Sequence, residues 1–193
     1  IAYKIALVHF NNGSKYSPNK SIEENKLYKA EKQKAQEVCA EVVKYKFNNY
    51  GTQQCQNLLD KINEKQLSIQ TEKFVIPNTP IKSLLTYKNI NKAYFRIVKV
   101  DFDTYVSWIN KRNHNSDHNQ YLKDKLMSLS PIQAWHTNLE TDNDFNTHTT
   151  EVKIDALAKG HFVLLASDNE SFKHNKGSFQ YSSISSTNIS YLS

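Results

Sequence analysis

The segment Leu67-Ser-Ile-Gln-Thr-Glu-Lys-Phe-Val-Ile76 opens with alternating apolar and polar side chains, unlike the residues before it. A period of two is typical of a β-strand with one buried face, whereas the preceding residues follow a helical period. We therefore place the change from helix to strand at Gln66. Six later segments are also predicted to be strands: Ile81–Tyr87, Ala93–Val100, Ile132–Leu139, Thr147–Ile154, His161–Ser167 and Ser178–Ser186.

Seven short strands with turn signals between them predict an antiparallel β-sandwich. Pro77-Asn-Thr-Pro80 is one such turn, and Ala156–Gly160 predicts a tight connection into the strand that follows it. A parallel sheet would need a helix between successive strands, and most of the gaps are too short for one. The long gap, residues 101–129, is predicted to be an insertion with two short helices.

The first part of the chain predicts a helical hairpin. Apolar side chains between Glu23 and Phe47 recur at steps of three to five, close to the period of a helix with one buried face. Ser21 and Glu24 have the spacing of a capping box at its start.

A break at Asn48-Asn-Tyr-Gly51 separates this helix from a second one. Gly51 suits a positive φ, and Thr52 is expected to cap the second helix. An earlier helix is predicted near Ala2–Phe10. The expected fold class is therefore α+β, with a helical segment over residues 1–66 and a seven-stranded antiparallel β-sandwich over residues 67–193, which carries a helical insertion near 101–129.

The composition fits a folded domain and argues against some partners. The chain has 193 residues, of which 38% are hydrophobic, and a formal net charge of +6. Basic charge raises nucleic acid as a partner, but the lysines are scattered among acids and only two arginines occur, Arg96 and Arg112. We therefore expect no nucleic-acid partner. No apolar run approaches the length of a membrane span, so we expect no direct membrane insertion.

Both ends of the sequence look like cuts inside a longer chain. Ile1–Phe10 resembles the middle of a helix, and Asn188–Ser193 resembles the beginning of a strand. The sequence shows neither a signal peptide nor an initiating methionine. We therefore expect a fragment of a larger protein.

Two cysteines, Cys39 and Cys55, lie on the two predicted helices of the hairpin. They are too few for a four-ligand zinc site. One alternative is a single disulfide in an oxidising compartment, but helix spacing alone does not fix the geometry that a disulfide needs. The other, which we favour, is two small buried thiols.

The histidines offer no convincing active site. His114-Asn-Ser-Asp-His118 places two imidazoles and the carboxylate of Asp117 within five residues, a spacing that could hold a metal on a helix. Its residues are loop formers, however, so we interpret it as a solvated loop. Trp135-His136 and His148 lie in predicted strands, where packed or rim positions are expected. We recognise no nucleophile with an oriented base.

Four acidic side chains are candidates for paired carboxylates: Glu140, Asp142, Asp144 and Glu151. Two of them, Asp142 and Asp144, also offer oxygens to a calcium ion. Thr141-Asp-Asn-Asp144 consists of turn formers and is interpreted as a turn between strands. A calcium loop of the EF-hand type also needs a glycine and a distal glutamate, which are missing. We therefore predict no catalytic, cofactor-binding or metal-binding residue, no cofactor, and a protein that is not an enzyme.

Seven stretches carry a family resemblance: Tyr50–Leu59, Gln66–Gln70, Tyr87–Asn89, Ala93–Ile97, Pro131–Trp135, Thr147–Glu151 and Leu157–Ser167. Their order resembles that of the bacterial alpha-2-macroglobulin family, and the resemblance covers most of the chain from about Glu23 to the end. It implies a helical stretch that leads into a macroglobulin domain, which is a seven-stranded sandwich of fibronectin-like shape. Its motifs identify the scaffold better than the activity.

The resemblance implies a part in a broad-spectrum protease trap. In this family a protease cuts a bait region, the inhibitor collapses around it, and many members bind it through a thioester with the motif Cys-x-Glu-Gln. Neither Cys39 nor Cys55 has this motif, so no thioester residue carries over. We expect a non-catalytic scaffold domain in the periplasm or the outer-membrane-associated cell envelope. Its partners would be neighbouring domains of the same parent chain and, through the parent, proteases.

The alternative function is a cell-surface adhesion or glycan-binding β-sandwich module. It would need exposed aromatic side chains, and Trp108 and Trp135 are the candidates. Core packing is the default position for aromatic residues at strand or helix spacing.

Overall fold

The computed structural model describes residues 1–111, 118–172 and 179–187, and its fold is α+β. The chain forms two compact units. The helical unit consists of Ile1–Gln66, Thr86–Asn91 and Leu139–Thr149, and the sheet unit of Leu67–Leu85, Lys92–Asn138 and the described residues from Thr150 on. A division at residue 66 alone therefore leaves out two later segments that belong to the helical unit. Sequence periodicity does not assign them, because each consists of a connection and the end of one strand beside it.

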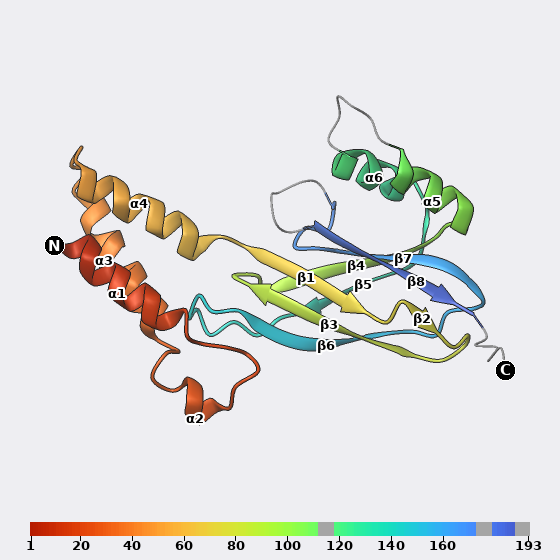
Figure 1. The fold of residues 1–193 in the computed structure, drawn as a ribbon, viewed down its shortest axis with the longest axis horizontal. Helices are drawn as coiled ribbons and strands as arrows, with labels where there is room; N and C mark the ends of the chain where they lie inside the picture. The colour runs from red at the N-terminus through yellow and green to blue at the C-terminus, as the bar shows by residue number, and fades with distance from the viewer. Residues whose placement is uncertain (112–117, 173–178, 188–193) are drawn as a thin grey trace. The chain divides into compact units, whose positions relative to one another are not determined.

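Three helices pack side by side in the helical unit: α1 (Ala2–Gly13), α3 (Glu31–Lys44) and α4 (Tyr50–Asn63), coloured red to orange in Figure 1. Their fully buried core is made of small and apolar side chains: Ala6, Ala35, Cys39, Cys55 and Ile62. Gly13 lets α1 and α3 approach closely, because a Cβ at this position would lie 2.6 Å from Cγ of Lys32. The earlier helix and the hairpin thus form one bundle.

The predicted helix over residues 23–47 is split in two. A short helix, α2 (Ile22–Asn25), comes first, and α3 follows separately. The predicted capping box at Ser21 is present, but it caps α2. The buried side chain of Asn25 hydrogen-bonds both backbone groups of Ser17, the N–H at 3.0 Å and the carbonyl at 2.7 Å. These local bonds compete with the helical pattern and hold the chain in a loop.

The cap of α4 is Asn49 and not the predicted Thr52. The side-chain oxygen of Asn49 accepts a hydrogen bond from the backbone N–H of Thr52 at 3.0 Å. Gly51 lies in the first turn of α4, and the residue with positive φ between α3 and α4 is Lys46, at 51°. The helix begins earlier than predicted because asparagine is one of the strongest N-cap residues.

Asn49→Ala is expected to lower the free energy of unfolding by about 1 kcal/mol, because it leaves the N–H of Thr52 without its acceptor. Urea unfolding followed by circular dichroism measures the change. Asn48→Ala is the matched control, since its exposed side chain is not the cap, and it should cost less than about 0.5 kcal/mol. Equal losses in both variants would contradict the assignment of the cap.

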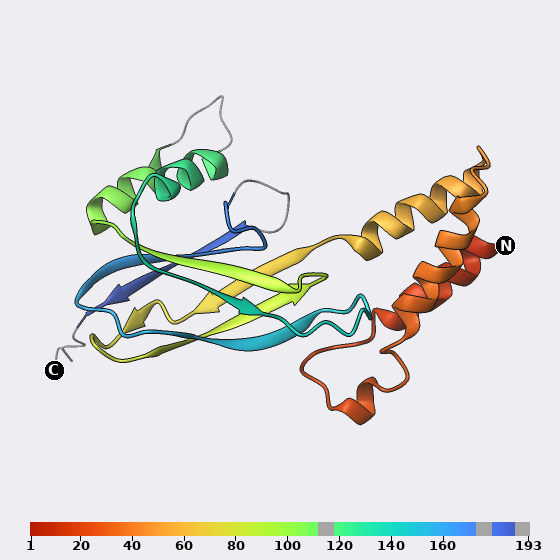
Figure 2. The same cartoon turned by 180° about the vertical axis from the view of Figure 1, so that it is seen from behind.

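Figures 1 and 2 show two sheets as separate layers. One sheet has the strand order β1-β3-β6 and the other β2-β8-β7-β4-β5. The strands are β1 (Gln66–Thr71), β2 (Phe74–Val75), β3 (Ile81–Lys88), β4 (Lys92–Lys99), β5 (Pro131–Asn138), β6 (His148–Ile154), β7 (Gly160–Ser167) and β8 (Phe179–Ser186). Every segment predicted to be a strand therefore contains one.

The first predicted strand, Leu67–Ile76, is two strands on different sheets. The charged pair Glu72-Lys73 interrupts the alternation, and the chain passes there from β1 to β2. β2 pairs with β8 in the parallel direction, with Phe74 opposite Ser185. The described residues thus form eight strands, and one pairing departs from the predicted antiparallel pattern.

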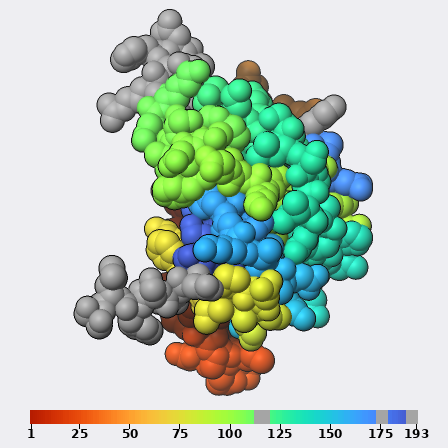
Figure 3. All heavy atoms as spheres, turned by 90° about the vertical axis from the view of Figure 1, so that its right-hand side faces the viewer, coloured from red at the N-terminus to blue at the C-terminus, as the bar shows by residue number. Residues whose placement is uncertain are grey.

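β7 is buried from His161 to Ser167. It lies between β4 and β8, and Val163 and Leu165 pack beneath the two helices of the insertion, α5 (Phe102–Asn110) and α6 (His118–Met127). Figure 3 shows these helices, in green to teal, above the blue strands. A strand covered on both faces carries an uninterrupted apolar run, which explains this sequence.

The predicted insertion with two short helices is confirmed by α5 and α6. Within the described part of the chain, no helix combines the length and the apolar character needed to cross a membrane.

Candidate functional site

A polar cavity of about 340 Å³ lies in the helical unit. Asparagine and aspartate side chains make up most of its lining, from three separate parts of the chain: the end of α4, the turn between β3 and β4, and the loop between β5 and β6. The members that matter below are Asn89, Asn91, Asp142, Asp144, Asn146 and His148.

The carboxylate of Asp144 organises the loop between β5 and β6. Its Oδ1 accepts a hydrogen bond from the backbone N–H of Asn146 at 2.9 Å and lies 2.9 Å from Nε2 of His148. Asn143 and Phe145 adopt left-handed backbone conformations, with φ of 52° and 58°. Asp144 is only 4% exposed, and a carboxylate at this depth requires such partners.

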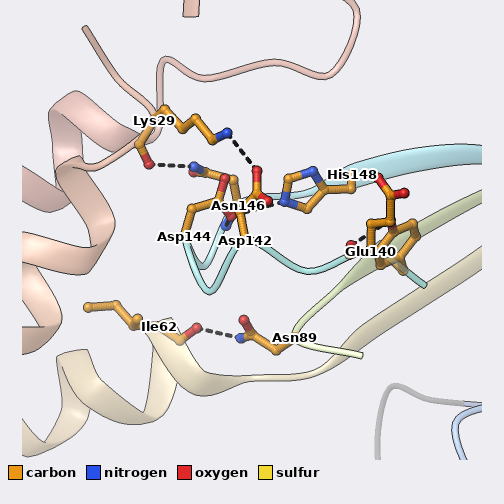
Figure 4. A network of polar contacts seen from close by, with 9 residues as sticks. Lys29, Ile62, Asn89, Glu140, Asp142, Asp144, Asn146 and His148 are labelled. Atoms are coloured by element: carbon orange, nitrogen blue, oxygen red, sulfur yellow. Dashed lines mark hydrogen bonds and ion pairs between the residues drawn. The ribbon is translucent and has the colours of Figure 1, made fainter. Parts of the chain in front are cut away.

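Lys29 ties this loop to the helices of the unit, as Figure 4 shows. Its ammonium group lies 2.6 Å from Oδ2 of Asp142, and its backbone carbonyl accepts a hydrogen bond from Nδ2 of Asn146 at 2.9 Å. The hydrogen bond between the two charged groups lowers the pKa of Asp142 and raises the pKa of Lys29. Both charged side chains are about half exposed, at 56% and 52%.

The turn between β3 and β4 holds the C-terminal end of α4. Nζ of Lys88 donates to the carbonyl oxygen of Lys61 at 2.9 Å. Nδ2 of Asn89 donates to the carbonyl oxygens of Ile62 and Glu64 at 2.8 and 3.0 Å. The last carbonyls of a helix have no partner within it, so these bonds satisfy groups that would otherwise be unpaired. We call Lys88 and Asn89 the α4 clamp.

Two tyrosines flank His148, with the ring centroids of Tyr16 and Tyr87 at 5.9 and 5.8 Å from that of the imidazole. Burial raises the pKa of both phenols, helped by the negative charge of Asp144 at Tyr16 and of Glu140 at Tyr87. The hydroxyl of Tyr87 donates to the carbonyl oxygen of Glu140 at 2.9 Å. Both phenols are therefore neutral at neutral pH and serve as donors and packing surfaces, not as bases.

The buried polar atoms of the cavity that lack a partner among the described residues are acceptors. Oδ2 of Asp144 and Oδ1 of Asn146 are buried and have no hydrogen-bond partner among the described residues. In the same part of the chain, no three His, Cys, Asp or Glu side chains form a group that could hold a metal ion. The chemistry available here is therefore the binding of a cation or of an N–H donor by carboxylate and amide oxygens.

A second polar group, in the sheet unit, pairs His161 with Ser185. Nδ1 of His161 lies 3.0 Å from Oγ of Ser185, and the imidazole packs against the rings of Phe102 and Tyr105 at 5.3 and 5.0 Å. Burial lowers the pKa of His161, and the charge of Asp101 partly opposes this. In a catalytic triad the second nitrogen of the histidine bonds a group that orients the ring, and Nε2 of His161 has no partner in the described residues. We interpret this pair as a packing contact.

The residues considered from the sequence are spread over the chain. His114 and Asp117 lie outside the described residues, and His118 is the first residue of α6, with its side chain outside the described part. Glu151 pairs with Lys82 at 2.8 Å and does not line the cavity.

The remaining candidates lie on β5, in the loop that follows it, or at the start of β6, and only some of them line the cavity. Asp142, Asp144 and His148 line the cavity, whereas Glu140 contributes its backbone carbonyl to Tyr87. His136 lies exposed on β5, and Trp135 is half-buried there.

The two cysteines are free thiols buried in the helical bundle. Burial and a hydrogen bond with Cys55 raise the pKa of Cys39 to about 12. Cys39 therefore stays protonated at neutral pH, and a protonated thiol is a poor nucleophile and metal ligand.

Lys29, Asn146 and the α4 clamp were not predicted as site residues. Asn146 had a signal, because Asp142-x-Asp144-x-Asn146 places oxygen donors at alternate positions, as calcium loops do. No sequence pattern marks Lys29 or Lys88, since their partners lie far away in the sequence.

Comparisons with known proteins give no family. No family model and no curated protein matches the sequence. The crystal structure of the CARDB domain of the PF1109 protein from Pyrococcus furiosus, in complex with di-metal ions, is 10% identical with a TM-score of 0.36, over 64% of this chain and 88% of that one. The solution structure of the same domain is 8% identical with a TM-score of 0.33, over 63% and 93%.

A superoxide reductase (neelaredoxin) from Ignicoccus hospitalis is 9% identical with a TM-score of 0.34, over 68% of this chain and 87% of that one. Likenesses with TM-scores this low carry no argument about the function of this chain. The resemblance to alpha-2-macroglobulins therefore stays a prediction.

Proposed function

We propose that this chain is a non-catalytic scaffold segment of a bacterial alpha-2-macroglobulin-like protease inhibitor. The supporting observation is where the stretches of the family resemblance lie. Tyr50–Leu59 lies in α4, Gln66–Gln70 in β1, Ala93–Ile97 in β4, Pro131–Trp135 in β5, and most of Leu157–Ser167 in β7. Most of Thr147–Glu151 lies in β6, and Tyr87–Asn89 contains the α4 clamp. All seven stretches thus contribute to helices, to strands or to the α4 clamp.

On this proposal the two sheets are a seven-stranded macroglobulin domain of fibronectin-like shape. β1 and β2 then count as two parts of its first strand, which agrees with their origin in one continuous segment, Leu67–Ile76. The parent protein is exported to the periplasm or the outer-membrane-associated cell envelope. Its other domains are the direct partners of this chain, and proteases are the partners of the whole.

The burial pattern favours a scaffold role. β7 is covered on both faces, and the α4 clamp fixes the end of a helix through three hydrogen bonds. A protease trap stores a conformation that a single cut releases. Its scaffold domains must keep their shape while their neighbours move, and closely packed interiors of this kind resist deformation.

The proposal is tested by incubating the parent protein with trypsin. We expect the trapped protease to cleave a small chromogenic peptide but not casein, because the trap excludes large substrates. This chain alone should inhibit neither reaction. Unhindered digestion of casein in the presence of the parent would contradict the trap, and inhibition by this chain alone would contradict the scaffold role.

One observation favours the alternative of a glycan-binding module. Trp135 stacks on Phe95 with a centroid distance of 5.1 Å, beside Arg96, at a hollow of about 180 Å³ on the sheet unit. Loss of glycan-array binding in Trp135→Ala, with binding retained in Trp108→Ala, would support this function over the scaffold.

A further inference from the structure

Two buried oxygen atoms in the loop between β5 and β6 lack a partner within the described chain: Oδ2 of Asp144 and Oδ1 of Asn146. Their residues are only 4% and 1% exposed, so bulk water does not supply the missing hydrogen bonds. An unpaired buried acceptor costs about 1–3 kcal/mol, and a charged one costs more. Both atoms can only accept, so the missing partner is a cation or a donor.

The same loop brings a third oxygen donor to the same cavity. Asp142, Asp144 and Asn146 alternate with Asn143 and Phe145, the two residues in the left-handed conformation. All three polar side chains line the cavity, and Figure 4 shows them gathered at the loop, beside Lys29. Two carboxylates and an amide oxygen are hard ligands, which suit calcium better than a transition metal.

We propose that this loop binds a calcium ion through the side-chain oxygens of Asp142, Asp144 and Asn146. Calcium takes six to eight oxygen ligands. Asn89 and Asn91 line the same cavity and can add amide oxygens, with water completing the shell.

The affinity is expected to be low. The loop begins like an EF-hand, with oxygen donors at its first, third and fifth positions, but Thr147 stands where that loop has glycine. Lys153 stands where it has the bidentate glutamate. We therefore expect a dissociation constant of about 10⁻⁴–10⁻³ M, the range of extracellular calcium modules.

Lys29 competes with calcium for Asp142. Its ammonium group lies 2.6 Å from the Asp142 carboxylate, so calcium binding must open this ion pair. Exposed ion pairs contribute little free energy, and this one is half exposed, so opening it is a small cost. Lys29→Met removes the competing charge and is expected to tighten calcium binding roughly two- to fivefold. A mutation that improves metal binding is hard to explain by general damage to the fold.

The experiment is thermal unfolding of the full chain over 0–10 mM CaCl₂ at constant ionic strength, with MgCl₂ in a parallel series. Calcium should raise Tm with a saturating dependence, because a ligand that binds only the folded state stabilises it. Asp142→Asn, at a half-exposed position that tolerates substitution, should weaken binding roughly tenfold by removing one ligand charge.

The matched control is the second lysine–carboxylate pair, Lys82 and Glu151, which has similar geometry at 2.8 Å and lies outside the cavity. Lys82→Met and Glu151→Gln should leave the calcium response unchanged. The calcium site is overturned if neither the wild type nor Lys29→Met responds to 10 mM calcium. It is equally overturned if magnesium gives the same shift, or if Asp142→Asn responds like the wild type. The calcium assay involves no protease, so a negative result would overturn the calcium site and leave the protease-trap proposal untouched.

Discussion

Phe95→Ala is expected to lower the free energy of unfolding by about 3–5 kcal/mol. Phe95 is 1% exposed and lies on β4, between β5 and β7, with its ring stacked on Trp135. Removing the ring loses its transfer free energy and leaves a cavity that strands hydrogen-bonded on both sides cannot close. Denaturation in guanidinium chloride, followed by tryptophan fluorescence and circular dichroism, measures the loss.

Phe74→Ala is the matched control. Phe74 is also a phenylalanine on a strand of the same sheet, but it is 66% exposed. Its removal should cost less than about 1 kcal/mol. Losses of similar size in the two variants would show that the sheet does not bury Phe95 as described.

The strands were predictable because most of them bury one face, and β5 half-buries alternate residues. A buried face imposes a period of two on the sequence, and β3 shows it directly, with alternate residues buried from Ile81 to Leu85. β7 was predictable for another reason, since a short apolar run after Gly160 fits a strand covered on both faces. Periodicity therefore captured the parts of the fold that depend on the hydrophobic core.

Polar side chains explain where the helical prediction failed. Ser21 and Asn25 bond to nearby backbone and split one expected helix, and Asn49 takes the cap expected at Thr52. Periodicity counts apolar residues, so it does not register a single hydrogen bond that ends a helix.

The contacts that join the loop of the candidate site to the helices were beyond sequence reasoning for a different reason. Asn146 and Lys29 are 117 residues apart in the chain and meet through one side-chain-to-backbone hydrogen bond. Lys88 reaches Lys61 in the same way. Such contacts follow from how loops and helices are placed in space, and they leave no periodic trace in the sequence.

Raising the pH from 7 to 9.5 is expected to add about 2 kcal/mol of stability through Lys88, and Lys88→Met should remove this gain. Lys88 is 6% exposed, and burial, followed by the positive charge of Lys32, lowers its pKa to about 8. In the unfolded chain the pKa returns to its ordinary value of 10.5. Between these two values the unfolded chain binds a proton at Lys88 that the folded chain has released, so stability rises with pH.

Other groups titrate in the same window, and a difference measurement separates them. Burial also lowers the pKa of Lys32, which gives an effect of the same sign. Cys39, with its pKa raised to about 12, acts in the opposite direction, because its thiol ionises first in the unfolded chain. Cys39 is present in both the wild type and Lys88→Met and cancels in the difference between their unfolding free energies. Lys32 loses a neighbouring positive charge in Lys88→Met, so this difference reports Lys88 together with its coupling to Lys32.

Urea unfolding of both proteins between pH 7 and 9.5 gives this difference. The control is Lys82→Met, because the side chain of Lys82 is 76% exposed. The difference in unfolding free energy between this variant and the wild type should not change with pH. At pH 7 the methionine variant loses the hydrogen bond to the carbonyl of Lys61 but escapes the cost of a buried charge, so it should be at least as stable as the wild type. The unfolding free energy of the wild type should then rise relative to that of the variant as the pH increases. Parallel curves would mean that the ammonium group of Lys88 is solvated, and the α4 clamp would then act through charge attraction at the helix end.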